Sequence, residues 1–139
     1  SPSYIEQMGA PQMPDELVAH RCLVYSLLSD YEYWYVTDSK GKEFRTKIQP
    51  YLKASTGEFL RDAAVEGMGI IMVPSFIAYQ EIEGGALVQI LNDYIPPKLE
   101  AYAIYPQTRH LSRRVRAFVD FLVNRFSGTP YWDLCLETD

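Results

Sequence analysis

One junction constrains this chain more than any other part: a segment with helical periodicity, a glycine pair and an apolar run follow one another. Apolar residues recur at helical spacing through residues 58–66, Gly67 and Gly69 come next, and residues 70–73 are continuously apolar. Gly67 is expected to cap the helix in the left-handed region, which glycine enters at low cost. A continuously apolar strand indicates burial on both faces, as in a parallel or mixed sheet covered by helices. The junction therefore predicts an α/β unit.

The three residues Gly67-Met68-Gly69 are also a fragment of a dinucleotide-binding fingerprint. That fingerprint requires a strand before the glycines and a helix after them, with the pyrophosphate at the helix N-terminus. Here the helix comes first and the strand second. The glycines therefore indicate a helix-to-strand joint rather than a phosphate-binding loop.

Composition limits the class of protein. The chain has 139 residues, of which 47% are hydrophobic and 22% charged, as in one soluble globular domain. No apolar run approaches the ~20 residues of a membrane span, and residues 1–10 lack the features of a secretory signal, so we expect a cytoplasmic protein without membrane contact. Cys22 and Cys135 lie far apart without metal-ligand spacing, so we expect free thiols, no metal and no cofactor. Because the chain opens without methionine, we expect it to be part of a longer polypeptide.

The net charge of -5 argues against nucleic acid as a direct partner of this chain. A basic cluster is the local exception, at the start of an expected helix, where the helix dipole favours acidic groups. The cluster contains Arg109, His110, Arg113, Arg114 and Arg116. It indicates either acidic neighbours in the fold or at an interface, or a solvated basic patch.

The remaining elements can be assigned from pattern. Helices are expected where capping residues or prolines precede helical periodicity: residues 1–8, a segment from Pro14, residues 75–82 and residues 111–126. Strands are expected over residues 21–26, 31–38, 43–48, 51–54, 87–91 and 99–105. Turn residues between the second and third of these strands predict a hairpin. Residues 92–98, which contain a proline pair, are expected to be a linker.

Several segments, taken in order, resemble the effector-binding domain of LysR-type transcriptional regulators. The motifs that carry the resemblance are AAxxGxGIxxxPxF in AAVEGMGIIMVPSF, GxLVxxL in GALVQIL, and YPxxRxLSxxVRAFxDFL before the last helix ends. The resemblance covers about residues 1–126 and implies a periplasmic-binding-protein-like fold. That fold has α/β lobes, each a mixed sheet flanked by helices, with an effector held between the two lobes.

The resemblance also implies a division of this chain. Residues 1–97 correspond to lobe two with the crossover, and residues 98–127 to a strand and helix that return to lobe one. Lobe one is then incomplete, so the second lobe is only partly present. Residues 128–139 form a C-terminal tail that matches no pattern of the family.

The function implied by the resemblance is regulation rather than catalysis. A small-molecule effector would control transcription through an oligomer of the parent protein, and DNA would be bound only by a helix-turn-helix domain outside this chain. Self-association is expected, with the apolar stripe at residues 115, 118, 119 and 122 covered by a second copy or by the body. The alternative is a lobe of a solute-binding receptor for transport, because the fold is shared. An enzyme is the third option, and it would require titratable groups that converge in a pocket.

The first candidate effector site is the segment Ser55-Thr56-Gly57, between an expected strand and the helix over residues 58–66. Unpaired N–H groups and the dipole make a helix start receptive to anions, and the hydroxyl groups add directional donors. In LysR-type regulators polar residues at the matching position contact effectors, which makes Thr56 the first choice. The alternative is a capping box, in which Ser55 and Glu58 satisfy the same N–H groups.

Further candidates are apolar or aromatic. Pro74 and Phe76 follow the carboxyl end of the strand over residues 70–73, where ligands of open α/β sheets bind, although Phe76 could equally be a core residue of the next helix. Tyr33 shares a strand face with Tyr31 and Tyr35, and this face could stack on an effector or pack under a helix or at an interface.

A nucleophile and base are the remaining possibility to consider. His20 and Cys22 would lie two apart on one strand and would point in the same direction rather than at each other. No third orienting group or oxyanion motif accompanies them. We therefore expect a buried structural cysteine and no catalytic residue.

Overall fold

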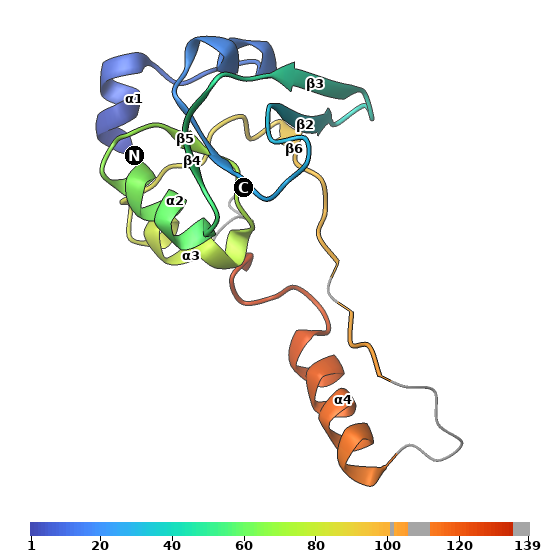
Figure 1. Cartoon of the computed structure of the whole chain (residues 1–139). Helices are drawn as coiled ribbons and strands as arrows, with labels where there is room; N and C mark the ends of the chain where they lie inside the picture. The colour runs from blue at the N-terminus through green and yellow to red at the C-terminus, as the bar shows by residue number, and fades with distance from the viewer. Residues whose placement is uncertain (101, 106–111, 135–139) are drawn as a thin grey trace.

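The computed structural model of the chain describes residues 1–100, 102–105 and 112–134. Its central element is β1 (Cys22–Tyr25), the middle strand of a three-stranded parallel sheet, sheet A, in the order β4-β1-β5 (Figure 1). β4 spans Pro50–Ala54 and β5 spans Ile70–Ile71. The first three residues of β1 are all buried, as expected for a strand that is covered on both faces.

The two faces of sheet A carry separate hydrophobic cores because successive strand residues point to opposite sides. On one face, Leu23 packs with residues of α2 (Gly57–Val65) and α3 (Ser75–Glu83). On the other face, Cys22 and Val24 belong to a core that includes residues from the N-terminal helices and from a second sheet. Those helices are α1 (Pro2–Met8) and the 3-10 helix η1 (Pro14–Ala19). The α/β character expected from the sequence is confirmed.

The joint between α2 and β5 is built as the sequence predicts. Gly67 has φ 76°, in the left-handed region, and its N–H donates to the carbonyl of Ala64 at 3.0 Å. The strand after the joint differs from expectation. β5 is an edge strand of two residues, and only Ile70 is buried. The strand buried on both faces is instead β1, which lies between the other two.

The second sheet, sheet B, is antiparallel and has the order β3-β2-β6. β2 (Tyr33–Asp38) and β3 (Glu43–Lys47) form the predicted hairpin. The Asp38 carboxylate accepts from the N–H groups of Lys40 and Lys42, both at 2.9 Å, and so closes the turn. The structure thus contains one parallel and one antiparallel sheet, with parallel and antiparallel pairing kept apart.

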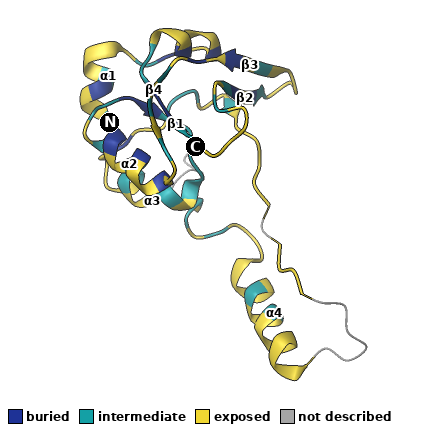
Figure 2. Ribbon diagram, in the orientation of Figure 1, coloured by how far each residue is buried: buried dark blue, intermediate teal, exposed yellow. Residues whose placement is uncertain are grey.

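Two strand predictions are wrong. Residues 87–91 form no strand: after Gly85 the N–H of Leu87 donates to the carbonyl of Glu81, and Leu91 has φ 56°, which a strand cannot contain. The third strand of sheet B is β6 (Tyr94–Ile95), inside the expected linker. The described part of residues 99–105 also forms no strand and is exposed (Figure 2).

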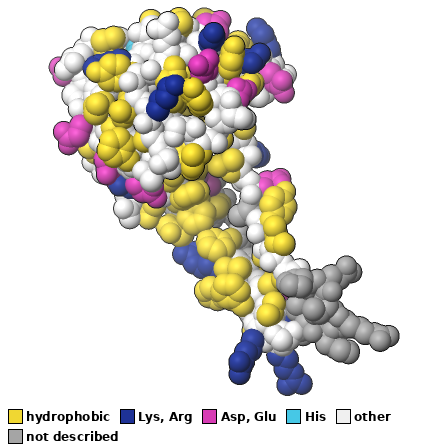
Figure 3. Space-filling model, in the orientation of Figure 1, with side chains coloured by type: hydrophobic (Ala, Val, Ile, Leu, Met, Phe, Trp, Pro, Cys, Tyr) yellow, Lys and Arg dark blue, Asp and Glu magenta, His cyan; other side chains and the backbone are white. Residues whose placement is uncertain are grey.

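α4 (Arg113–Phe126) forms where helical periodicity predicts it, with the Ser112 hydroxyl accepting from the N–H of Val115 at 3.3 Å. None of its residues is buried, and the helix extends away from the body (Figures 1 and 2). The body therefore does not cover the apolar stripe, which leaves a second copy as the expected cover, and hydrophobic side chains on this arm are visible in Figure 3. Among the described residues, no helix is long and apolar enough to cross a membrane.

Candidate functional site

The carboxyl ends of the three parallel strands of sheet A share one edge, where open α/β sheets bind ligands. β1 is followed by Ser26, β4 by Ser55, and β5 by Met72. The N–H of Ser26 donates to the carbonyl of Ala54 at 2.8 Å, which holds the ends of β1 and β4 together. This edge is the candidate site.

The starts of α2 and α3 meet at this edge. A Cβ added to Gly57 would lie 2.5 Å from Cδ1 of Ile77, so only glycine at position 57 allows this approach without a shift. The guanidinium of Arg61 donates to the carbonyl of Ile77 at 3.3 Å and pairs with Glu81 at 3.3 Å. The structure therefore brings the segment Ser55-Thr56-Gly57 close to the first turn of α3.

Thr56 is the N-cap of α2, and its side chain makes no capping hydrogen bond. Ser55 and Thr56 are both exposed. Because the cap is Thr56, Glu58 lies at the second helical position, one short of the position that a capping box requires. The capping box considered from the sequence is therefore not formed, and the first N–H groups of α2 lack the side-chain acceptor that usual N-caps provide.

Pro74 and Phe76 begin α3. Pro74 is the N-cap, and its carbonyl accepts from the N–H of Ile77 at 3.0 Å. Phe76 is 55% exposed, so it is not a core residue; Ala78 is the buried residue of α3. The ring of Phe76 lies edge to face with Trp132, with centroids 6.2 Å apart.

Tyr33 lies elsewhere, on sheet B. The Arg45 guanidinium stacks on its ring, 3.7 Å from the centroid, and also donates to the Tyr35 hydroxyl at 3.1 Å. Tyr35 in turn donates to Asp30, and this hydrogen bond raises the pKa of Tyr35. Tyr33 and Tyr35 thus both contact an arginine of their own sheet.

His20 and Cys22 do not form a catalytic pair. His20 follows η1 and its Nδ1 is 3.1 Å from the Tyr4 hydroxyl, whereas Cys22 Sγ donates to the carbonyl of Leu17 at 3.6 Å. Burial raises the pKa of the Cys22 thiol to about 12, so the thiol stays protonated near neutral pH. Among residues 1–100, 102–105 and 112–134, no three His, Cys, Asp or Glu side chains are grouped as metal ligands would be.

Sequence reasoning missed one part of the site, the loop after β1. Leu27 and Leu28 are 68% and 60% exposed, directly after Ser26 at the shared edge. The expected strand over residues 21–26 predicts where this loop begins. Its place at the shared edge depends on the parallel pairing of β1 with β4 and β5, which the sequence does not reveal.

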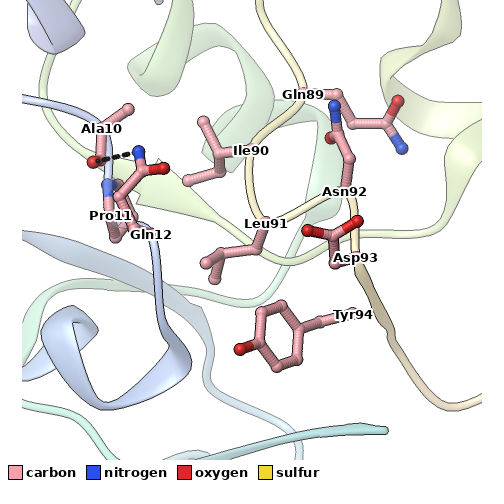
Figure 4. A pocket seen from close by; sticks show the side chains of 9 residues that line it. All are labelled: Ala10, Pro11, Gln12, Gln89, Ile90, Leu91, Asn92, Asp93 and Tyr94. Carbon is pink, nitrogen blue, oxygen red and sulfur yellow. Dashed lines mark hydrogen bonds between the residues drawn. The ribbon is translucent and has the colours of Figure 1, made fainter. Parts of the chain in front are cut away.

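A separate pocket of about 280 Å³ lies between the loop after α1 and the segment before β6 (Figure 4). Its lining consists of Ala10, Pro11, Gln12 and residues 89–94. On one side of the pocket the Gln12 amide donates to the carbonyl of Ala10 at 3.0 Å. None of the effector-site residues predicted from the sequence lines this pocket.

Comparisons with known proteins agree on one family. Residues 1–127 match the family described as LysR substrate binding domain. The chain is 34% identical over 129 residues to the HTH-type transcriptional regulator CrgA of Neisseria meningitidis serogroup B, and 37% identical over 115 residues to an uncharacterised HTH-type transcriptional regulator of Haemophilus influenzae. These matches cover 92% and 83% of this chain but only 42% and 40% of the two relatives. The chain thus spans about two fifths of their length.

Solved structures give the same result. The regulatory domain of CrgA aligns with a TM-score of 0.73 at 34% identity, over 89% of this chain and 60% of that domain. Full-length AphB of Vibrio cholerae, a virulence activator, aligns with a TM-score of 0.78 at 30% identity, over 89% of this chain and 42% of that protein. These relatives are transcriptional regulators and not transport receptors. The chain belongs to the family of LysR substrate-binding domains, the effector-binding domains of LysR-type transcriptional regulators.

Proposed function

We propose that this chain senses a small-molecule effector and passes the signal to DNA through the rest of a LysR-type regulator. Residues 1–97 would form lobe two with the crossover, residues 98–127 would return to lobe one, and residues 128–139 would be a tail. DNA would be bound by a helix-turn-helix domain outside this chain, in an oligomer, and the protein would work in the cytoplasm. The names of the relatives, all HTH-type regulators, support this division of roles.

The effector would bind at the shared edge of sheet A, against Ser55, Thr56 and Gly57 on one side and Pro74 and Phe76 on the other. The observation that carries this proposal is the exposed Thr56 hydroxyl without a capping bond, at a helix start that touches the first turn of α3. Such a start offers N–H donors and positive potential, which suit a carboxylate or another anion. Exposed Phe76 would contact an apolar part of the effector.

Tyr33 is the outlying member of the proposed set. Its ring is already stacked on Arg45, and it belongs to the other sheet. We expect its substitution to weaken effector binding less than substitution of Thr56.

Sensing would operate by differential affinity. An effector that contacts both lobes favours the arrangement in which both walls reach it, and coupling of ~1 to 3 kcal/mol is enough for an ordinary allosteric response. No chemical step is required of the side chains. We expect no enzymatic activity, in keeping with the separate engagement of His20 and Cys22.

A thermal-shift screen against small carboxylates tests the site. A binder at ten times its Kd should raise the melting temperature by about 4 °C. Thr56→Val should abolish the rise because it removes the hydroxyl, whereas Thr37→Val, the same change on sheet B, should preserve it. An equal rise in both variants would exclude Thr56 from the site.

A further inference from the structure

The segment that follows α4 turns back onto α3. Gly128, with φ 82°, redirects the chain after the helix, and the N–H of Asp133 donates to the carbonyl of Pro130 at 2.9 Å to close a turn. In Figure 1 this segment leads from α4 back to the body beside α3. We call residues 129–134 the strap. The family match ends at residue 127, before the strap begins.

Aromatic rings hold the strap on α3. Trp132 lies edge to face with Phe76, at 6.2 Å and 73°, and Tyr131 lies edge to face with Tyr79, at 5.7 Å and 82°. Phe76 and Tyr79 are three residues apart, so they share one face of α3. Two ring pairs at favourable geometry on one helix face make a specific contact rather than an accidental one.

The same rings connect the strap to the end of α4. Phe126 lies 5.7 Å from Trp132, and the guanidinium of Arg125 stacks over Tyr131 at 4.8 Å. Trp132 is only partly buried, and Phe76 keeps 55% of its surface exposed. The contact therefore has defined ring geometry but stays partly exposed to solvent, and partial exposure makes its release easier.

Phe76, which the strap contacts, lies at the proposed effector site. Phe76 directly precedes Ile77, whose side chain lies against Gly57 at the start of α2, so the strap docks on the first turn of α3, which forms one wall of the proposed effector site. We propose that the strap is a built-in cover of this wall, and that Trp132 occupies the surface on Phe76 that an effector's apolar part would use. The competition with effector rests on the proposed function, but the docking of the strap does not.

The cover is tested without any ligand by a neutral nitroxide in solution, which broadens the NMR signals of accessible protons. In the Trp132→Ala variant the broadening at Phe76 and Tyr79 should increase at least about twofold, because the rings that shield them are removed. Trp132→Phe keeps a ring and should stay near the wild-type value. Tyr102→Ala, which removes an exposed aromatic ring outside both α4 and the strap contacts, is the matched control and should change nothing at these positions.

Benzoate, a ring with a carboxylate, is the probe for competition. Its affinity, followed by the amide shifts of Gly57 and Ile77, should rise about three- to tenfold in Trp132→Ala and remain within about twofold in Trp132→Phe. Unchanged nitroxide broadening in Trp132→Ala would overturn the cover, whatever benzoate does. Increased broadening without benzoate binding in any variant would support the docked strap and count against the proposed site instead. Benzoate binding of equal strength with and without Trp132 would overturn the competition.

Discussion

The two glycines of the joint between α2 and β5 are required for different physical reasons. Gly67 needs its positive φ, which residues with a Cβ rarely adopt. Gly69 does not have a positive φ, but a Cβ at this position would collide with the backbone carbonyl of Arg21, the residue directly before β1. The first glycine was understood from sequence alone. The second could not be, because its neighbour is distant in the chain.

Substitution of Gly69 by alanine should destabilise the fold strongly. The added methyl group meets backbone, which cannot move without disturbing the pairing of β1 and β5, so we expect a loss of about 3 kcal/mol of unfolding free energy. Gly57→Ala is the matched control because its Cβ meets only the end of the Ile77 side chain, and it should cost about 1 kcal/mol. Urea denaturation of both variants gives the comparison, and equal losses would contradict the distinction.

The Cys22 thiol should be unreactive in the folded protein. Burial raises its pKa from 9.0 to about 12, so almost no thiolate exists at pH 8, and a Cys135→Ser variant should react with a thiol reagent only after unfolding. The stability contributed by the buried thiol is fully present below pH 9, the ordinary pKa, and is lost as pH rises toward 12. Rapid modification of the native variant at pH 8 would show that Cys22 is accessible.

At the scale of elements, the N-caps of α2 and α4 differ although both have a hydroxyl side chain. Ser112 accepts from the third residue of its helix, whereas Thr56 makes no such bond. A hydroxyl group that does not cap its own helix can form hydrogen bonds with a ligand. This contrast distinguishes a structural cap from a candidate binding residue.

The contrast predicts different costs of removing the two hydroxyl groups. Thr56→Ala should lower the unfolding free energy by less than about 0.5 kcal/mol, because no capping bond is lost. Ser112→Ala should weaken α4 by about 1 kcal/mol, seen as faster amide hydrogen exchange in a helix that has no buried residue to compensate. A loss of 1 kcal/mol or more from Thr56→Ala would mean that its hydroxyl caps α2 in solution.

Sequence patterns predicted those elements whose signals are local. The helix over residues 58–66, its glycine cap and the hairpin of β2 and β3 follow from periodicity and turn residues, and all are present. The strand expected over residues 87–91 is absent. Its apolar side chains pack individually into the two hydrophobic cores, and its backbone joins neither sheet. β6 was missed because two residues gain strand geometry only from pairing with β2.

The candidate site was predicted in the same uneven way. Thr56 and Phe76 could be chosen because helix starts and strand ends are visible in sequence. Their proximity depends on the packing of Gly57 against Ile77, which no local pattern reveals. Tyr33 was selected for its chemistry, but no local pattern reveals that its hairpin forms a sheet separate from sheet A.

At the scale of the whole molecule, α4 leaves an apolar face without cover. Val115 and Phe118 are 38% and 61% exposed, and half-buried Val119 and Leu122 continue the same face. We expect a second copy to cover this face, so sedimentation equilibrium should show a concentration-dependent dimer. Phe118→Glu should weaken it at least about tenfold, since burying one phenylalanine contributes about 1.5–3 kcal/mol. Asn124→Glu, the same charge on the opposite face of α4, should not. A chain that stays monomeric at every concentration would rule out self-association through α4.

The most direct test of the proposed sensing site is an NMR titration of the chain with acetate, succinate and benzoate, followed at every assigned amide. We predict that the shifts concentrate in residues 55–58 and 75–77, at the two helix starts that meet at the edge of sheet A, and that Thr56→Val reduces them. Shifts that concentrate instead in residues 89–94, around the separate pocket, with the helix starts unchanged, would contradict the assignment.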